Sequence, residues 1–261
     1  MKHRISAVLL GTIPFVLLLS LWQIFSHFHL VPRWLIPPPY DVFSVLAKLF
    51  YNGTWLKLIG VSFLNIFPPF VFAILCAFLC GVSMGLNKTI HKILNPFIAA
   101  VYPIPSLAWL PIIVLFLGFT REGIWLTIFI SAFFRMIYSV VTGVKSVDYH
   151  LILAAKNLGI SKFGIIYKVI LPAAMPHLIV GMRVSFGSAW RSLIGAEMLS
   201  LTLDGLGKFI WSAQWNFDYE KVIAGIIVIS LVGFLVDRII FRYIESRTLE
   251  RWGVLEHNKI Q

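Results

Sequence analysis

The sequence predicts an all-α integral membrane protein with six transmembrane helices and both termini in the cytoplasm. Of its 261 residues, 59% are hydrophobic and only 13% are charged, and the mean hydropathy is +0.88. A soluble domain of this length would carry more charge to cover its surface. The apolar residues form long runs, and the basic residues gather between alternate runs. We therefore expect one transmembrane domain over residues 1–261, with its core at about 60–242.

Six apolar runs are long enough to cross a bilayer. The hydrocarbon core is about 30 Å thick and requires roughly 20 residues of helix. The runs cover residues 5–28, 62–86, 96–119, 124–143, 172–199 and 222–241. The first three contain no Asp, Glu, Lys or Arg, and the other three contain a few.

The lysines and arginines predict the orientation of these spans. With the N-terminus inside, thirteen of the 22 basic residues fall in inner segments, six in outer segments and three within spans. Inner loops of membrane proteins carry such an excess. Their contact with anionic lipid headgroups accounts for the net charge of +11, so no nucleic acid partner is expected. The first span follows the letters MKHR, but its apolar run is too long for a signal peptide, which indicates an uncleaved anchor.

Two outer segments are predicted to lie at the membrane surface. Pro37, Pro38 and Pro39 exclude regular helix, and residues 41–50 then show the apolar spacing of a short amphipathic helix. Residues 201–220 are too short and too polar to span, so we expect a short interfacial or re-entrant piece there.

The third span contains Pro103, Pro105 and Pro111 within nine residues. Each proline removes a backbone donor, which predicts a broken helix. Broken helices are tolerated at membrane depth where they face protein or a water-filled cavity. The break is interpreted either as the wall of a pathway or a moving gate, or as a packing kink.

Residues 146–171 form a basic segment between the fourth and fifth spans. Asp148 suits a helix start, Gly159 suits the left-handed turn that ends this helix, and Ser161 suits the cap of a second helix. Pro172 predicts that the second helix ends near Leu171. The first helix carries one apolar stripe, made of Leu151, Ala154, Ala155 and Leu158. Such a small, flat face suits docking into a groove of another protein, with a solvated loop as the alternative.

Other patterns give no site. The letters GVSMG at 81–85 match the Gly-x-Ser-x-Gly nucleophile pattern, but they end an apolar span and equally match a close-packing GxxxG face. Cys76 and Cys80 are interpreted as small core residues. The histidines show no metal-ligand spacing, and the sequence has no Gly-rich phosphate loop ending in Lys-Ser or Lys-Thr. No catalytic residue, metal or cofactor is expected.

Segment 146–171 resembles the cytoplasmic signature of ATP-binding-cassette (ABC) importer permeases. That signature reads Glu-Ala-Ala, three residues, Gly, nine residues, then Ile-x-Leu-Pro. The matching positions are Ala154, Ala155, Gly159, Leu171 and Pro172. Val169 holds the isoleucine position, and Leu153 stands where the signature has glutamate. Further stretches are similar to the nitrate/sulfonate/taurine subgroup: IPPPYDV (36–42), PSLAWLPIIVLFLG (105–118), KSVDYHLILAAKNLGIS (145–161), GMRVSFGSAWRSLIGAEML (181–199) and GLGKFI (205–210).

The resemblance implies a type I ABC importer permease fold in a bacterial cytoplasmic (inner) membrane. Its partners would be a second copy of the permease, forming a homodimer, with cytoplasmic ATP-binding subunits and an extracytoplasmic solute-binding protein. Segment 146–171 would be the coupling-helix loop that sits in a cleft of the ATP-binding subunit, with Leu153 and the five matching residues at the contact. ATP hydrolysis would reside on that subunit, so this chain is not expected to be an enzyme.

The fifth span holds charges that are costly in a membrane. At 100° per residue, one face of this helix collects Arg183, Gly187, Trp190, Ile194 and Glu197. Arg183 and Glu197 lie roughly 21 Å apart along the axis, so each needs a partner elsewhere. We expect Pro111, Arg183, Gly187, Trp190 and Glu197 to line the translocation pathway, with structural ion pairing between helices as the alternative.

The resemblance also bears on the solute. A small anion such as a sulfonate, taurine or nitrate would suit Arg135, Arg183 and Arg191. The family also imports thiamine-precursor pyrimidines and riboflavin-like compounds, which remain alternatives. An ion-coupled secondary transporter would explain the charged fifth span but not the docking segment. An intramembrane hydrolase that depends on Ser83 is a third class.

Overall fold

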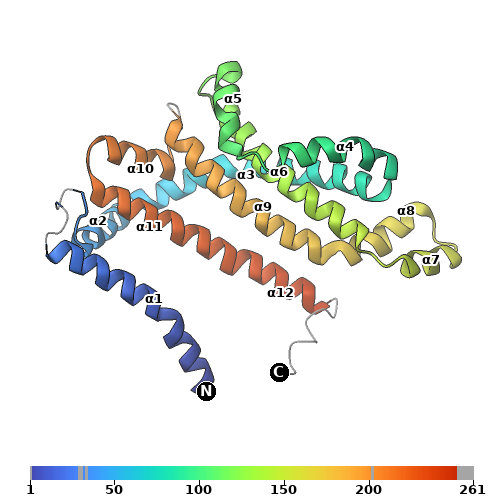
Figure 1. The fold of residues 1–261 in the computed structure, drawn as a ribbon, viewed down its shortest axis with the longest axis horizontal. Helices are drawn as coiled ribbons and strands as arrows, with labels where there is room; N and C mark the ends of the chain where they lie inside the picture. The colour runs from blue at the N-terminus through green and yellow to red at the C-terminus, as the bar shows by residue number, and fades with distance from the viewer. Residues whose placement is uncertain (1, 29–31, 33–34, 201–202, 252–261) are drawn as a thin grey trace.

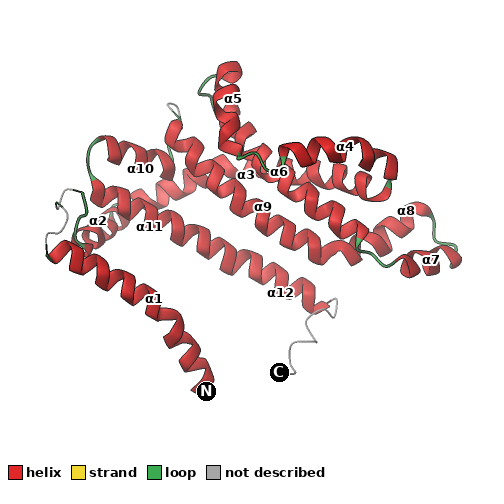
Figure 2. Ribbon diagram, viewed as in Figure 1, coloured by secondary structure: helices red, strands yellow, loops and turns green. Residues whose placement is uncertain are grey.

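The computed structural model describes residues 2–28, 32, 35–200 and 203–251. Every regular element in this part of the chain is helical (Figures 1 and 2). In chain order the elements are α1 (Lys2–His27), α2 (Pro39–Tyr51), α3 (Thr54–Leu86), α4 (Lys88–Val101), the 3₁₀ turn η1 (Ser106–Trp109), α5 (Leu110–Leu117), α6 (Arg121–Lys145), α7 (Tyr149–Asn157), α8 (Lys162–Ile165), the π-helical η2 (Ile166–Ile170), α9 (Leu171–Leu199), α10 (Leu206–Trp215), α11 (Tyr219–Leu235), the π-helical η3 (Val236–Phe241) and α12 (Arg242–Arg251). The all-α prediction is confirmed for these residues.

Among the described residues, four continuous helices are long and apolar enough to cross a membrane. They are Thr54–Leu86, Arg121–Lys145, Lys162–Leu199 and Tyr219–Ser246. A bent pair, Lys88–Val101 with Ser106–Leu117, makes a fifth if the two helices count as one span. The apolar part of α1, Thr12–His27, is shorter than these four. The count of six spans and the cytoplasmic termini stay predictions, and residues 252–261 lie outside the described part.

The core is built by α6, which packs along both α3 and α9. Glycines of α3 let α3 and α6 approach closely. A Cβ added at Gly81 would lie 2.6 Å from Val140, and one added at Gly85 would lie 2.5 Å from Val144. The GVSMG letters are therefore a helix-packing face, as the GxxxG alternative predicted. The Oγ of Ser83 donates to the Leu79 carbonyl at 2.8 Å, within its own helix.

The third span is broken, as its prolines predict. Pro103 and Pro105 fall between α4 and η1, and Pro111 occupies the start of α5. The two halves meet at 89°, so α5 points away from the bundle while α4 lies along it (Figure 1). The apolar run at 96–119 is therefore not one straight helix, because two backbone donors are missing at the bend.

The prediction that the second short helix ends near Leu171 is wrong. Helices α8, η2 and α9 form one continuous helix, Lys162–Leu199. The π-helical turn η2 precedes Pro172, and the Leu171 N–H bonds to the Ile166 carbonyl. This widened turn accommodates the missing proline donor and the bulk of its ring, so the helix continues instead of ending.

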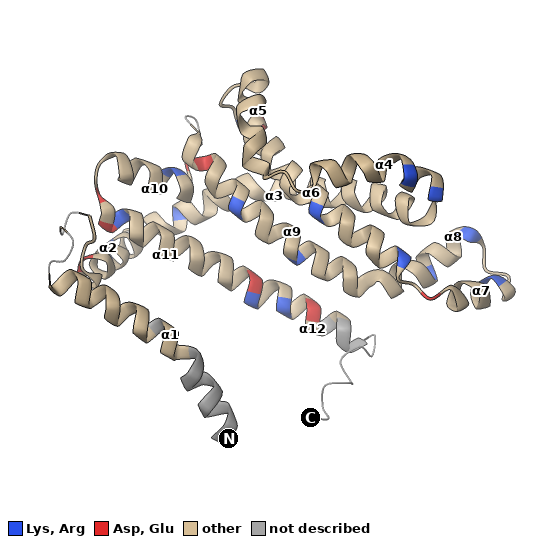
Figure 3. Ribbon diagram, in the orientation of Figure 1, with Lys and Arg blue, Asp and Glu red and all other residues tan. Residues whose placement is uncertain are grey.

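The molecule has two distinct ends. Helices α2 and α10 lie at one end and α7 and α8 at the other (Figure 1). Basic residues of α4, α6, α7 and α8 gather at the α7–α8 end (Figure 3), as expected of an inner face. Both short surface helices, expected at 41–50 and within 201–220, are present as α2 and α10, although Leu201 and Thr202 lie outside the described residues.

Candidate functional site

The loop at 146–171 has the local structure that its sequence predicts at both caps and at the turn. The Asp148 carboxylate accepts from the His150 N–H at 2.8 Å and starts α7. Gly159 follows α7 with φ +74°, a left-handed conformation that costs side-chain-bearing residues strain. The Ser161 Oγ accepts from the Gly164 N–H at 3.2 Å and caps α8. These three residues fix two short helices at the basic end of the molecule.

The apolar stripe of α7 is divided between the interior and the surface. Ala155 is buried and packs into the core, while Leu153 is half-buried. Ala154 is exposed, and Leu151 and Leu158 are 53% and 80% exposed. Leu151 and Leu158 therefore remain exposed, and sequence reasoning missed two exposed aromatic side chains further along the segment, Phe163 and Tyr167, which are 85% and 74% exposed.

The two remaining signature residues lie at the start of the long helix. Leu171 and Pro172 are both half-buried and follow the π-helical turn directly. They join the loop rigidly to α9, because no break separates Lys162 from Leu199.

Glu197 is fully buried near the C-terminal end of α9. Its carboxylate accepts from Ser62 Oγ at 2.9 and 3.0 Å, from Asn65 Nδ2 at 3.2 Å and from the Gly207 N–H at 3.0 Å. The Ser62 Oγ in turn accepts from the Leu206 N–H at 3.0 Å. The N-terminus of α10, where partial positive charge favours an anion, is thus held against α3 and α9 by one acidic side chain.

Arg183 lies half-buried about three turns into α9 and pairs with acids of the last helix. Its Nε and Nη2 lie 2.6 Å from Oδ1 and Oδ2 of Asp237, and Nη1 lies 3.3 Å from Oε2 of Glu245. Two carboxylates therefore neutralise this guanidinium. Arg183 and Glu197 do not meet, as their spacing predicts, and each has partners on other helices.

The other predicted pathway residues lie in different surroundings. Trp190 is buried, with its ring centroid 5.8 Å from that of Phe63 and 6.4 Å from that of Phe186. Gly187 is half-buried, and nothing lies within 4 Å of a Cβ built on it. Pro111 is exposed on α5, apart from the others. Their role in a pathway stays a prediction.

Arg135 lies near the middle of α6 and is paired with hydroxyl groups. Its Nε donates to Ser188 Oγ at 2.6 Å, and Ser188 Oγ lies 2.8 Å from Ser131 Oγ. Its guanidinium carbon lies 5.7 Å from the ring centroid of Tyr102. Among the described residues, no acidic side chain forms an ion pair with Arg135.

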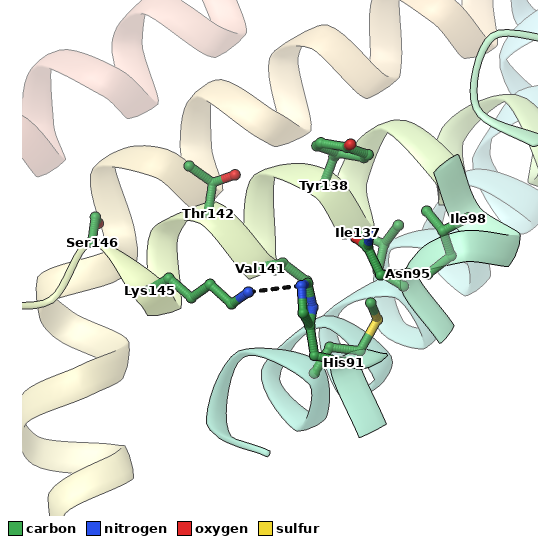
Figure 4. Close-up of a pocket in the computed structure, with 10 residues that line it drawn as sticks. His91, Asn95, Ile98, Ile137, Tyr138, Val141, Thr142, Lys145 and Ser146 are labelled. Atoms are coloured by element: carbon green, nitrogen blue, oxygen red, sulfur yellow. Dashed lines mark hydrogen bonds between the residues drawn. The ribbon is translucent and has the colours of Figure 1, made fainter. Parts of the chain in front are cut away.

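A groove of about 410 Å³ opens between α4 and α6, with α3 as its floor (Figure 4). Figure 4 shows His91 of α4 and Lys145 of α6 pointing at each other, and the Lys145 Nζ donates to His91 Nε2 at 2.9 Å. Asn95, Tyr138 and Thr142 line the space between this pair and the middle of α6.

Comparisons with known proteins place the chain in a family. The family described as "Binding-protein-dependent transport system inner membrane component" matches residues 70–250. This chain belongs to that family. The taurine transport system permease protein TauC of Escherichia coli (strain K12) is 32% identical over 257 residues, covering 97% of this chain and 90% of that protein. The putative aliphatic sulfonates transport permease protein SsuC of Bacillus subtilis (strain 168) is 29% identical, covering 89% and 84%.

A third relative and two solved structures agree with this assignment. The bicarbonate transport system permease protein CmpB of Synechococcus elongatus (strain ATCC 33912 / PCC 7942 / FACHB-805) is 27% identical, covering 96% of this chain and 91% of that protein. Two inward-facing structures of the MetNI methionine ABC transporter share the fold, with TM-scores of 0.56 and 0.58 at 17% and 16% identity. They cover 72% and 77% of this chain, and 95% and 97% of their own.

Family membership fixes the general role of this permease. It is a multi-pass inner membrane component of an ABC importer, and it works with ATP-binding subunits and a solute-binding protein. ATP hydrolysis belongs to the separate ATP-binding subunit, so the permease is not itself an enzyme.

Proposed function

We propose that two identical copies of this permease form the translocation pathway for a small oxyanion, of the sulfonate, taurine or nitrate kind. The observation that carries the proposal is the set of relatives named for taurine, aliphatic sulfonates and bicarbonate, which match 89–97% of the chain. These solutes share a small oxyanion group. Arginines within the spans are the residue type that binds such a group by charge and paired hydrogen bonds.

Each copy contributes six spans with both termini in the cytoplasm, and the lipid bilayer surrounds the pair. The pathway includes Pro111, Arg183, Gly187, Trp190 and Glu197. The burial of Trp190 and Glu197 inside one chain supports a framework role for those two, in which they hold the pathway helices in position. The carboxylates around Arg183 support the same role for that residue.

Segment 146–171 is the coupling loop for the ATP-binding subunit. Its exposed Leu151, Ala154 and Leu158 form the docking face, and Gly159 sets the angle between α7 and α8. Leu171 and Pro172 connect the loop to α9 through a helix without a break. Movement of the ATP-binding subunits reaches the spans by this rigid connection, as in other rearrangements at interfaces.

Docking is tested by replacing one exposed leucine with an acid. Leu158→Asp puts a charge in the docking face, and we expect the ATP-binding subunit to be lost from the purified complex. The matched control is Asn157→Asp, which adds the same charge at an exposed position off the stripe. Equal copurification with both variants would contradict the docking assignment.

The solute class is tested by uptake. The permease, its ATP-binding subunits and its binding protein are reconstituted in proteoliposomes with internal ATP, and uptake of labelled taurine, nitrate and bicarbonate is compared with uptake of riboflavin and a thiamine-precursor pyrimidine. We expect ATP-dependent uptake of an anion. Uptake of a ring compound alone would overturn the anion proposal, and uptake driven by an ion gradient without ATP would identify a secondary transporter.

A further inference from the structure

Arg135 differs from the other two arginines of the spans. Arg183 is neutralised by Asp237 and Glu245, and Arg191 is exposed. Arg135 is half-buried near the middle of α6, and its hydrogen-bond partner is the uncharged Ser188. A cation at membrane depth without a carboxylate partner is costly unless an anion or water compensates it.

Three hydroxyl groups line the same small cavity as this cation, those of Ser106, Ser131 and Ser188. Ser131 comes from α6, Ser188 and Ser192 come from α9, and Ser106 comes from η1 at the break of the third span. Ser106 Oγ lies 2.5 Å from Ser192 Oγ, so the break is fastened to α9 beside Arg135. A guanidinium with nearby hydroxyl donors is the chemistry that recognises an oxyanion.

Polar residues continue from Arg135 to the basic end of the molecule. On α6 they recur every three or four residues and occupy one face of the helix: Ser131, Arg135, Tyr138, Thr142 and Lys145. On α4, His91 and Asn95 line the same groove, and Tyr102 follows at the end of the helix. The Tyr102 and Tyr138 rings, 4.9 Å apart, stand between Arg135 and the groove.

We propose that Arg135 and its serine hydroxyls hold the transported oxyanion at membrane depth, and that the α4–α6 groove is its route to the cytoplasmic end. This inference rests on the proposed anion import. The cavity beside Arg135 measures about 30 Å³, which is room for water and not for a sulfonate. The site is therefore closed in this conformation, and it opens when the Ser106–Ser192 bond breaks and η1 moves away from α9.

The first test measures taurine uptake by the complete reconstituted transporter. Arg135→Gln should lower the initial uptake rate at least tenfold, with copurification of the ATP-binding subunit and thermal stability unchanged. Arg135→Lys keeps the charge but loses the two parallel donors of the guanidinium. Its uptake rate should therefore lie between that of the parent protein and that of Arg135→Gln. The control Arg121→Gln removes an exposed charge from the start of the same helix and should transport like the parent protein.

Failure of the two proposals is distinguishable in this assay. If the parent protein imports an anion and Arg135→Gln transports as well as Arg121→Gln, the Arg135 site is overturned while anion import stands. If Arg135→Gln loses stability and assembly together with uptake, Arg135 is a framework residue and the site is likewise overturned. If the parent protein imports no anion, the proposed function fails.

The second test needs no knowledge of the solute. Thr142→Cys, in a background with Cys76 and Cys80 replaced by alanine, places one thiol at an exposed position in the groove. A negatively charged methanethiosulfonate reagent should modify it at least tenfold faster than a positively charged one, and Arg135→Gln should reduce that preference at least threefold. Equal rates would overturn an anion route, and protection from both reagents would show that a second copy fills the groove.

Discussion

Arg183 and Asp237 form a bidentate ion pair in which both nitrogen–oxygen distances are 2.6 Å, and this pair joins the fifth span to the last one. Bidentate geometry of this kind is among the stronger charged interactions. Glu245, two turns further along the last helix, binds the same guanidinium at 3.3 Å. Both acids lie in the helix Tyr219–Ser246, so this cluster aligns two spans lengthwise.

The cluster of Arg183, Asp237 and Glu245 predicts how the loss of one carboxylate changes the thermal stability of the protein. Asp237→Asn removes the bidentate partner of Arg183 and leaves the longer contact to Glu245 as its ion pair, which weakens the connection between the two helices. We expect a clear drop in the thermal unfolding temperature of the detergent-solubilised protein. The double variant Arg183→Gln with Asp237→Asn should lose less than the sum of the two single losses, because both changes remove the same ion pair, whereas additive losses would show that the two residues act independently.

Replacing Glu197 should cost more stability than replacing Asp237, because several buried donors lose their shared acceptor. Glu197→Ala leaves the Ser62, Asn65 and Gly207 donors without their acceptor, at about 1–3 kcal/mol for each buried group. We expect the protein to lose monodispersity in size-exclusion chromatography, with Glu197→Gln less affected because its amide oxygen still accepts. Glu220→Gln, outside this network, is the control and should behave as the parent protein.

The glycine packing of α3 predicts a position-specific effect of one methyl group. Gly81→Ala would place its Cβ 2.6 Å from Val140, which forces α3 and α6 apart and costs about 1–3 kcal/mol. Gly60→Ala on the same helix has nothing within 4 Å and should be neutral or slightly stabilising. Thermal unfolding compares the two. In a Val140→Gly background, which lacks both contacting atoms, Gly81→Ala should cost less than in the parent protein, and similar unfolding temperatures for Gly81→Ala and Gly60→Ala would contradict this packing.

The sequence predicted those features of the fold that depend on one or two neighbouring residues. The caps at Asp148 and Ser161, the turn at Gly159 and the break at the third-span prolines all follow from one or two residues each, and the structure has them. Pro172 was the exception. The helix continues through Pro172 because the preceding turn is widened to a π-turn, and no local pattern in the sequence predicts that turn.

The partners of the charged residues in the spans could not be predicted from the spacing of residues along one helix. The partners of Arg183 and Glu197 lie 54 and more than 130 residues away, so periodicity could show that partners were needed but not which residues they are. The polar face of α6 was readable, because Ser131, Arg135 and Tyr138 repeat at helical spacing. Its meaning came from Ser188, which reaches Arg135 only once α6 and α9 are packed.

A substitution at Gly159 should impair the coupling of ATP hydrolysis to transport while it leaves the stability of the spans nearly unchanged. Its φ of +74° costs an alanine about 1–2 kcal/mol, while the space around it is open, so Gly159→Ala meets no steric contact within 4 Å. We expect α7 to shift its angle to α8 to relieve that strain, which lowers solute-stimulated ATP hydrolysis by the assembled transporter while the unfolding temperature of the spans changes little. Gly159→Asn tolerates the left-handed conformation and should restore stimulation. If Gly159→Ala and Gly159→Asn hydrolyse ATP alike, the angle set by Gly159 does not control coupling.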